Sequence, residues 1–262
     1  MPDDILILPP IPADRRVRYG PEPDQFLDLY AGKHHSSPLV LNIHGGFWRA
    51  KYDLAHASHL CSALAGHGWN VANLEYRRVG SPGGGWPRTF EDIRTAYRYL
   101  VQQARELGIA AEPAIVVGHS AGGQLALCLA ARESSIRGCV SLAGALDLRR
   151  VWELHLSNDA VVDYLGGTPE QVPDHYREAS PMELTIRAQQ AIIHGTKDDV
   201  VPIEIARTYA EAKKKRGEQV MFVELLNANH FDVIDPRSEA FGVVTDAIAK
   251  LQGPGTGGQE AV

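Results

Sequence analysis

The 262-residue sequence predicts an α/β fold, a mostly parallel twisted sheet of about eight strands with helices on both faces. Two observations predict it. Short apolar runs of strand length recur along the chain, and amphipathic segments of helical length separate them. Strands that alternate with helices in this way form parallel sheets whose two faces are both covered.

The first part of the chain predicts an antiparallel hairpin followed by a strand and a helix. Residues 16–19 and 26–30 alternate in character on either side of Gly20-Pro21-Glu22-Pro23, which is typical of a hairpin. Residues 39–43, Leu-Val-Leu-Asn-Ile, are a nearly continuous apolar run, as expected for a strand buried on both faces. Residues 53–65 then carry apolar side chains at helical spacing.

The rest of the chain repeats this alternation of strand and helix. Expected strands are residues 70–76, 114–117, 139–143, 191–193 and 220–225, and expected helices are residues 89–107, 121–131, 203–216 and 238–251. Residues 147–181 contain several Pro and Gly and follow no regular pattern, so that residues 148–181 are a candidate lid. We expect one domain over residues 1–252 and a disordered tail over residues 253–262.

Charge and hydropathy exclude several classes of partner. The net charge of −6 and the sequence pI near 6.0 give no reason to expect nucleic acid or acidic lipid. The one basic run, Lys213-Lys214-Lys215-Arg216, is interpreted as the solvated end of a helix. No apolar run approaches the roughly 18 residues needed to span a bilayer, so no membrane partner is expected.

Cysteine usage and the N-terminus indicate the compartment. Cys61, Cys128 and Cys139 are odd in number, and the last two lie in apolar surroundings, which predicts buried free thiols in a reducing compartment. The N-terminus opens with acids, unlike a signal peptide. We therefore expect a soluble cytoplasmic protein, either monomer or homodimer.

A lone serine marks the junction of a predicted strand and a predicted helix. Gly118-His119-Ser120-Ala121-Gly122 matches the pattern G-x-S-x-G in that context. A serine on so tight a turn has a strained backbone, and side chains two residues away on either side would collide. Glycine at both positions removes the collision, so the spacing predicts that Ser120 is held as a nucleophile.

A serine hydroxyl needs a base, and the base usually needs an acid that orients it. On such a fold these residues follow the serine in the order acid, then histidine, each in a loop after a later strand. Residues 191–193 run into a loop that contains Asp198 and Asp199. The last expected strand runs into a loop that contains His230.

With these residues in view, the chain resembles an α/β-hydrolase of the esterase branch whose oxyanion loop reads His-Gly-Gly. His44-Gly45-Gly46-Phe47-Trp48 carries that motif directly after the strand at residues 39–43. The resemblance implies that Ser120, Asp198 and His230 form the catalytic triad, with Asp199 as the fallback for the acid. It also implies an oxyanion hole built from the loop of Gly45, Gly46 and Phe47 together with Ala121.

The same motif indicates the substrate class. Phe47 stands where lipases of the hormone-sensitive-lipase type have a third glycine, which disfavours a lipid substrate. The Gly-Gly-Phe-Trp sequence is more similar to arylformamidases and to the feruloyl and acetyl-xylan esterase group, as are Asp163-Tyr164-Leu165-Gly166-Gly167 and Ala179-Ser180-Pro181. The tryptophans Trp48, Trp86 and Trp152 are candidates for an acyl or aryl pocket, with ordinary packing as the alternative.

Several histidines have structural interpretations instead. His44 is expected to brace the oxyanion loop, His194 to stabilise its own turn, and His119 to pack against a neighbouring strand. His56 and His59 lie near Cys61 on the first predicted helix, but no zinc-binding pattern accompanies them, and no metal is expected.

The leading hypothesis is hydrolysis of carboxylic esters of small or aryl substrates through an acyl-enzyme intermediate, without metal or organic cofactor. Arylformamidase activity on the amide of N-formylkynurenine is the second hypothesis, and an exopeptidase is a weaker third. A catalytically inert binding protein is the alternative from another class. Such a protein could lose Ser, Asp or His, whereas this sequence retains all three.

Overall fold

The computed structural model describes residues 4–34 and 37–253 of the chain. The tail that was expected to be disordered, residues 253–262, lies outside the described residues except for Gly253. Within the described part, no helix combines the length and the apolar character needed to cross a bilayer.

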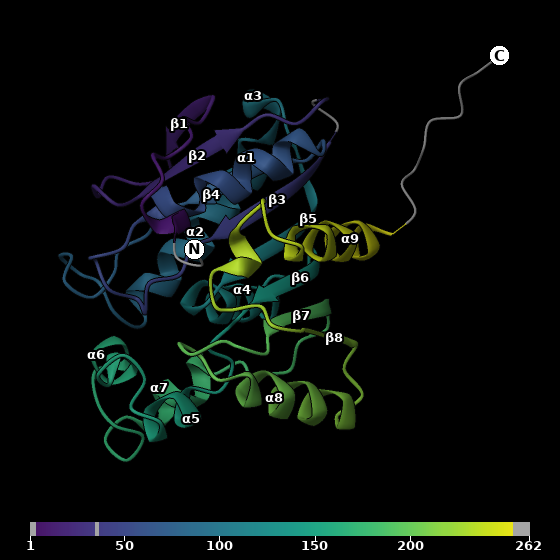
Figure 1. Ribbon diagram of the computed structural model, residues 1–262. Helices are drawn as coiled ribbons and strands as arrows, with labels where there is room; N and C mark the ends of the chain where they lie inside the picture. Colours follow the sequence, from purple (N-terminus) through teal and green to yellow (C-terminus); the bar gives the residue numbers. More distant parts are fainter. Residues whose placement is uncertain (1–3, 35–36, 254–262) are drawn as a thin grey trace.

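In the described ranges, eight strands form one mostly parallel sheet, which confirms the predicted fold class (Figure 1). Their order in the sheet is β1-β2-β4-β3-β5-β6-β7-β8. β1 and β4 both pair antiparallel with β2, and every other pair is parallel. The strands are β1 (Arg15–Arg18), β2 (Phe26–Tyr30), β3 (Pro38–Ile43), β4 (Asn70–Leu74), β5 (Ala110–His119), β6 (Ile136–Leu142), β7 (Gln189–Gly195) and β8 (Val220–Leu225).

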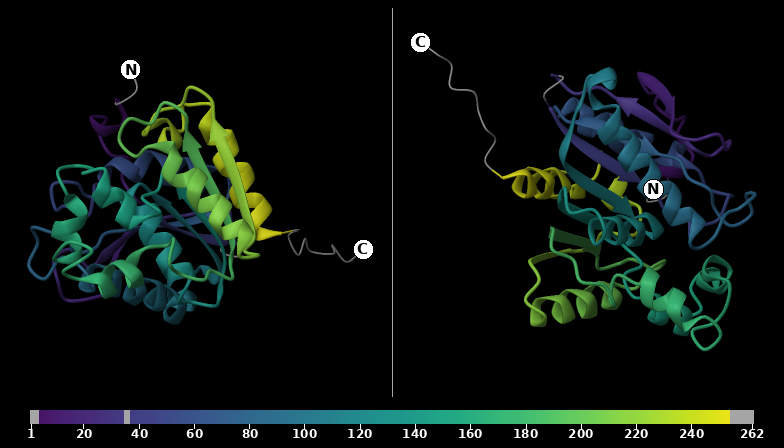
Figure 2. Two further views of the ribbon diagram at one scale, coloured as in Figure 1. Left: turned by 90° about the horizontal axis from the view of Figure 1, so that it is seen from below. Right: turned by 180° about the vertical axis from the view of Figure 1, so that it is seen from behind.

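Helices cover both faces of this sheet. The 3-10 helices are η1 (Asp4–Leu6), η2 (Leu54–Ala57) and η3 (Asp232–Ile234). The α-helices are α1 (Ser58–Gly66), α2 (Arg88–Gln102), α3 (Ala104–Leu107), α4 (Ala121–Ala130), α5 (Leu148–Glu153), α6 (Ala160–Leu165), α7 (Pro173–Ala179), α8 (Ile203–Lys215) and α9 (Ala240–Gln252). α1 and α9 lie on one face and α2, α4 and α8 on the other; Figure 2 shows α8 and α9 on opposite sides of the last strands.

The two layers of core follow from the strand periodicity. Leu39, Leu41 and Ile43 on β3 belong to the core under α2, α4 and α8, whereas Val40 belongs to the core under α1 and α9. Successive side chains of a strand point to opposite faces, so a central strand with both faces covered needs apolar residues at nearly every position. All four side chains are fully buried.

Three predicted elements differ from the observed ones. The helix expected over residues 53–65 begins as η2, where Asp53 accepts a hydrogen bond from the Ala55 N–H, and only then continues as α1. The helix expected over residues 89–107 is interrupted at Gln103 into α2 and α3. The segment over residues 147–181, expected to be irregular, contains α5, α6 and α7, which are too short to show a helical period.

The basic run at the end of α8 also differs from its prediction. Lys213, expected to be solvated, is fully buried. Its ammonium group forms an ion pair with Glu218 and donates a hydrogen bond to the Leu184 carbonyl. A single lysine in a basic run can be buried when an acidic partner is near. Here the partner is Glu218, which follows the turn at the end of α8.

The sheet gathers the loops of interest at one edge. β3, β5, β7 and β8 are parallel, so their carboxyl ends point the same way. Ile43 at the end of β3 pairs with Gly118, and Gly195 at the end of β7 pairs with Leu225. In open α/β sheets, ligands bind beyond these carboxyl ends.

Candidate active site

Ser120 occupies a strained turn between β5 and α4. Its φ of 55° and ψ of −120° lie in a region that residues with a side chain rarely adopt. Its N–H donates to the Leu142 carbonyl at 2.9 Å, and its own carbonyl accepts from the N–H groups of Gly123 and Ala145. These bonds hold the strained backbone in place, with the side chain at the start of α4.

The glycines two residues either side of Ser120 are sterically required. A Cβ on Gly118 would lie 2.1 Å from the Gly122 carbonyl oxygen. A Cβ on Gly122 would lie 2.0 Å from the carbonyl oxygen of Ile43 on the neighbouring strand. This is the crowding that the G-x-S-x-G spacing predicts.

His230 and Asp198 come together from the loops after β8 and β7. The His230 Nδ1 lies 2.8 Å from Asp198 Oδ2, and both side chains are buried. Asp199, the fallback for the acid, is exposed. The carboxylate of Asp198, not that of Asp199, therefore faces the imidazole.

Asp198 is surrounded by hydrogen-bond donors. Its Oδ1 accepts from the N–H groups of Val200 and Val201 at 2.9 and 2.8 Å, and its Oδ2 also lies 3.1 Å from His194 Nε2. Burial alone would raise the pKa of Asp198, but the hydrogen bonds from His194 and His230 and the backbone lower it well below its usual range. The carboxylate is therefore held in its ionised form.

Ser120 and His230 line one cavity of about 200 Å³. Two larger cavities have volumes of about 340 and 450 Å³. Pro10, Tyr30 and Ser58 are among the residues that line the first, and Ala130, Arg137 and Ala188 among those that line the second. Neither lining contains a nucleophile next to a base. Chemistry rather than size therefore selects the smaller cavity as the candidate site.

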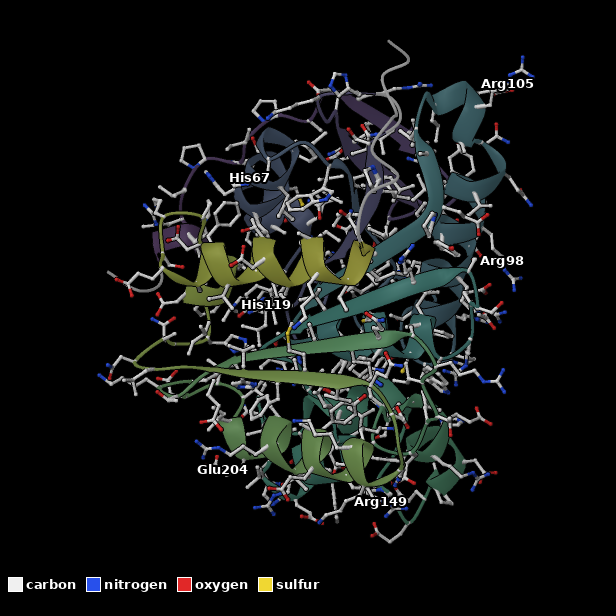
Figure 3. All side chains as sticks on the ribbon, turned by 90° about the vertical axis from the view of Figure 1, so that its right-hand side faces the viewer. His67, Arg98, Arg105, His119, Arg149 and Glu204 are labelled. Atoms are coloured by element: carbon white, nitrogen blue, oxygen red, sulfur yellow. The ribbon has the colours of Figure 1, made fainter. Side chains whose placement is uncertain are left out.

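His119 lies in this cavity too, which the sequence did not predict. It was expected to pack against a neighbouring strand, but its Nε2 lies 2.9 Å from the carbonyl oxygen of His230. Figure 3 shows its place in the interior, whereas the labelled Arg105 and Arg149 project from the surface. Burial lowers the pKa of His119 well below its usual value, as does the nearby His230, so that the ring is neutral.

The His44–Trp48 loop has an unusual backbone. Gly46, Phe47 and Trp48 have φ values of 112°, 48° and 57° in succession. Such a run is stable only when its surroundings fix it. The Trp48 ring does so: it is fully buried, stacks on Tyr164 at 4.5 Å between centroids, and donates from Nε1 to Gln124 on α4 at 2.9 Å.

A buried polar network supports the base of the same loop, as expected for His44. The two ring nitrogens of His44 lie 2.8 Å from the Gly45 carbonyl and 3.0 Å from Glu75 Oε1. Burial alone would raise the pKa of Glu75, but the adjacent His44 and Arg78 lower it below its usual value. Tyr76 stacks on His44 and donates its hydroxyl to the His44 carbonyl at 2.8 Å.

The residues expected to supply the oxyanion hole lie around Ser120. Gly46 and Phe47 line the cavity. Ala121 is the first residue of α4, where the N–H groups have no partner within the helix. Gly45 lies behind them, so close to the turn that a Cβ there would be 2.9 Å from the Ser120 Cβ.

The three tryptophans that were candidates for the pocket are not among its lining residues. Trp48 packs in the core as described above, because its indole N–H finds Gln124 there. Trp86 stacks on Phe90 and meets the edge of Tyr164, and Trp152 packs against the core on the inserted segment. Ordinary packing, which was the alternative to a pocket role for each tryptophan, therefore describes all three positions.

Besides His119, six lining residues were not singled out as pocket residues from the sequence. They are Leu6, Tyr52, His56, Ser157, Val200 and Phe231. Val200 lies two residues after Asp198, and Phe231 directly follows His230, so nearness in the sequence was the one signal available for them. His56 faces the cavity while His59 turns to the Pro9 carbonyl, and burial chiefly lowers the pKa of His56 to about 4. Among the described residues, no group of three or more His, Cys, Asp or Glu could hold a metal ion.

Comparison with known proteins gives the family. A family model described as BD-FAE matches residues 27–212. Esterase LipC of Mycobacterium tuberculosis is 28% identical over 84% of this chain and 60% of its own length. Kynurenine formamidase of Drosophila melanogaster is 23% identical over 84% of this chain and 75% of its own length.

Solved structures agree on the fold. A truncated carbohydrate esterase from gut microbiota superposes with a TM-score of 0.80 at 20% identity, covering 93% of this chain and 99% of that one. Esterase B from Lactobacillus rhamnosis gives a TM-score of 0.78 at 18% identity, covering 95% and 91%. The chain spans 60% and 62% of the M. tuberculosis esterases LipC and LipQ.

The crowding at Gly122 predicts opposite outcomes for two helical glycines. Gly122→Ala should destabilise the fold by about 1–3 kcal/mol or more, because its Cβ would press α4 away from β3. Gly242→Ala on α9 meets nothing within 4 Å and should stabilise by about 0.5–1 kcal/mol. Urea unfolding of both variants measures the difference, and equal effects would contradict the steric argument.

The lowered pKa of Asp198 predicts a pH dependence of stability. Because the folded carboxyl titrates below its ordinary value of 3.8, the unfolded chain binds the extra proton first, and this stabilisation is lost as the pH falls. Asp198→Asn should therefore lose less unfolding free energy between about pH 6 and pH 3 than the unchanged protein. Urea titrations at both values test this, with Asp199→Asn expected to keep the original dependence. Equal losses in all three proteins would count against it.

Proposed function

The chain belongs to the BD-FAE family, and on that premise we propose that it hydrolyses carboxylic esters with Ser120 as the nucleophile. Its fold and its His-Gly-Gly loop are those of an α/β-hydrolase esterase. One observation carries the proposal. The hydrogen-bonded pair of His230 and Asp198 shares a buried site with Ser120, on loops that three separate strands supply.

The protonation of His230 follows from its partner. A carboxylate accepts hydrogen bonds only, so Nδ1 carries the proton and Nε2 is left as the base. As Ser120 Oγ attacks the ester carbonyl, Nε2 takes the hydroxyl proton, and Asp198 stabilises the imidazolium that forms. The same proton then goes to the leaving alcohol, and an acyl-serine ester remains.

The second half of the reaction repeats these roles with water. His230 takes a proton from a water molecule that attacks the acyl carbonyl, and returns it to Ser120 as the acid leaves. In both halves negative charge develops on the carbonyl oxygen. N–H groups of Ala121 and of Gly46 or Phe47 are the proposed donors, and such a donor contributes about 100-fold to 1,000-fold in rate.

The walls of the cavity favour small or aryl esters. Its volume, about 200 Å³, is below the roughly 300–1,000 Å³ usual for ligand pockets. Phe47, Tyr52 and Phe231 provide aromatic surface. Ser157, from the inserted segment after α5, also lines the cavity, which supports the proposal that residues 148–181 act as a lid.

Arylformamidase activity is a second candidate that two observations favour. A kynurenine formamidase is among the relatives, with 75% of its length matched. The aromatic Phe47 follows Gly46 in the oxyanion loop and faces the cavity. The same serine chemistry cleaves a formamide, so only the substrate separates the two functions.

Ser120→Ala should reduce kcat for p-nitrophenyl acetate by about 10⁵-fold while leaving the fold intact, because it removes the proposed nucleophile. Ser157→Ala is the matched control, since that serine lines the same cavity without a paired base. A fluorophosphonate should label the unchanged protein and Ser157→Ala but not Ser120→Ala. An unlabelled, inactive wild-type protein would instead indicate an inert binding protein on this fold.

The two candidate substrates can be compared directly. We expect kcat/KM for p-nitrophenyl acetate to exceed that for N-formylkynurenine. An activated ester is hydrolysed more readily than an amide, and the small cavity favours the smaller substrate. Absorbance assays on one preparation measure both. A higher kcat/KM for N-formylkynurenine would make the formamidase the better assignment.

A further inference from the structure

The N-terminal segment contributes a residue to the wall of the candidate active site. Within η1, Ile5 is 1% exposed and belongs to the core that also contains Val233 and Ile234 of η3. The next residue, Leu6, is 39% exposed and lines the cavity of Ser120 and His230. Ile7 is 82% exposed and is not a lining residue. Figures 1 and 2 show this turn at the same end of the molecule as η3.

Hydrogen bonds hold the segment that follows against α1 and β2. The Pro9 carbonyl lies 3.1 Å from His59 Nε2. The Ile11 N–H donates to Ser58 Oγ at 3.0 Å, and the Ile11 carbonyl accepts from the Tyr30 hydroxyl at 3.0 Å. Pro9, Pro10 and Pro12 fix the backbone between and around these contacts. Leu6 therefore stands between two anchors, the buried Ile5 and the hydrogen bonds of Pro9 and Ile11.

We propose that Leu6 is a specificity-determining residue, whose side chain closes the cavity against long acyl chains and restricts the enzyme to short-chain esters. This inference rests on the proposed function. Among the described residues before Gly46, only Leu6 lines the cavity, so this part of the wall is supplied by a segment that carries none of the proposed catalytic groups.

The size of the side chain sets the expected effect. Leu6→Ala removes three carbons from the wall of a cavity of about 200 Å³, which leaves room for an acyl chain longer by about the same number of carbons. One methylene in an apolar pocket changes specificity by about 10-fold or more. Leu6 is partly exposed, so its loss should leave the fold intact.

The experiment measures kcat/KM for p-nitrophenyl acetate, butyrate, hexanoate and octanoate. In Leu6→Ala the hexanoate-to-acetate ratio should rise about 10-fold, and in Leu6→Trp it should fall below that of the unchanged protein. Ile7→Ala is the matched control, an equivalent change at the adjacent, outward-facing residue, and it should leave the ratio unchanged. Unchanged ratios in both Leu6 variants would overturn the proposal.

Fluorophosphonate labelling of Ser120 in each variant separates this inference from the proposed function. If Ser120 is labelled in the Leu6 variants but their preference for acyl-chain length is unchanged, Leu6 has no role in specificity and the proposed serine hydrolase activity stands. If the unchanged protein shows no labelling and no hydrolysis, both the role of Leu6 and the proposed function are overturned.

Discussion

The structure depends on the close approach of α4 to the end of β3. With no side chain on Gly122, the first turn of the helix comes against the Ile43 carbonyl, where a Cβ would be only 2.0 Å away. That contact places Ser120 beside the loop that leaves β3. The strained backbone of Ser120 and the positive φ values of Gly46 to Trp48 meet at this junction. Backbone hydrogen bonds hold the first, and the packing of the Trp48 ring holds the second.

Hydrogen bonds stabilise the buried carboxylate of Asp198. A buried carboxylate is costly unless its lone pairs are used, and Asp198 faces two backbone N–H groups and two imidazoles. The Asp198 carboxylate is therefore held ionised and oriented toward His230, and both side chains are buried. Around it, His119 and His56 are neutral because burial disfavours their charged forms, so they add no competing positive charge.

The inserted helices are coupled to the same junction. Trp48 joins the loop of residues 44–48 to α4 through Gln124 and to α6 through its stack on Tyr164. Arg49, the next residue, reaches Ser157 and Asn158 in the loop before α6 at 3.4 and 3.3 Å. A shift of the inserted segment would therefore act on the loop that borders the cavity, which is a physical route for a lid to influence the site.

Local sequence patterns were enough to predict most of the strands and helices and the turn at Ser120. Nearly continuous apolar runs such as residues 39–43 predict a strand buried on both faces. The need for glycine at position 118 follows from a clash with the Gly122 carbonyl, within five consecutive residues. It also predicted Asp198 and His230 as partners of Ser120, because both lie in loops that follow later expected strands in that order. Only the tertiary structure decided which other side chains meet there. Leu6 reaches the cavity from the opposite end of the chain, Trp48 turns into the core, and Lys213 is buried against Glu218. Local patterns encode backbone geometry, whereas these contacts join residues that no short-range period relates.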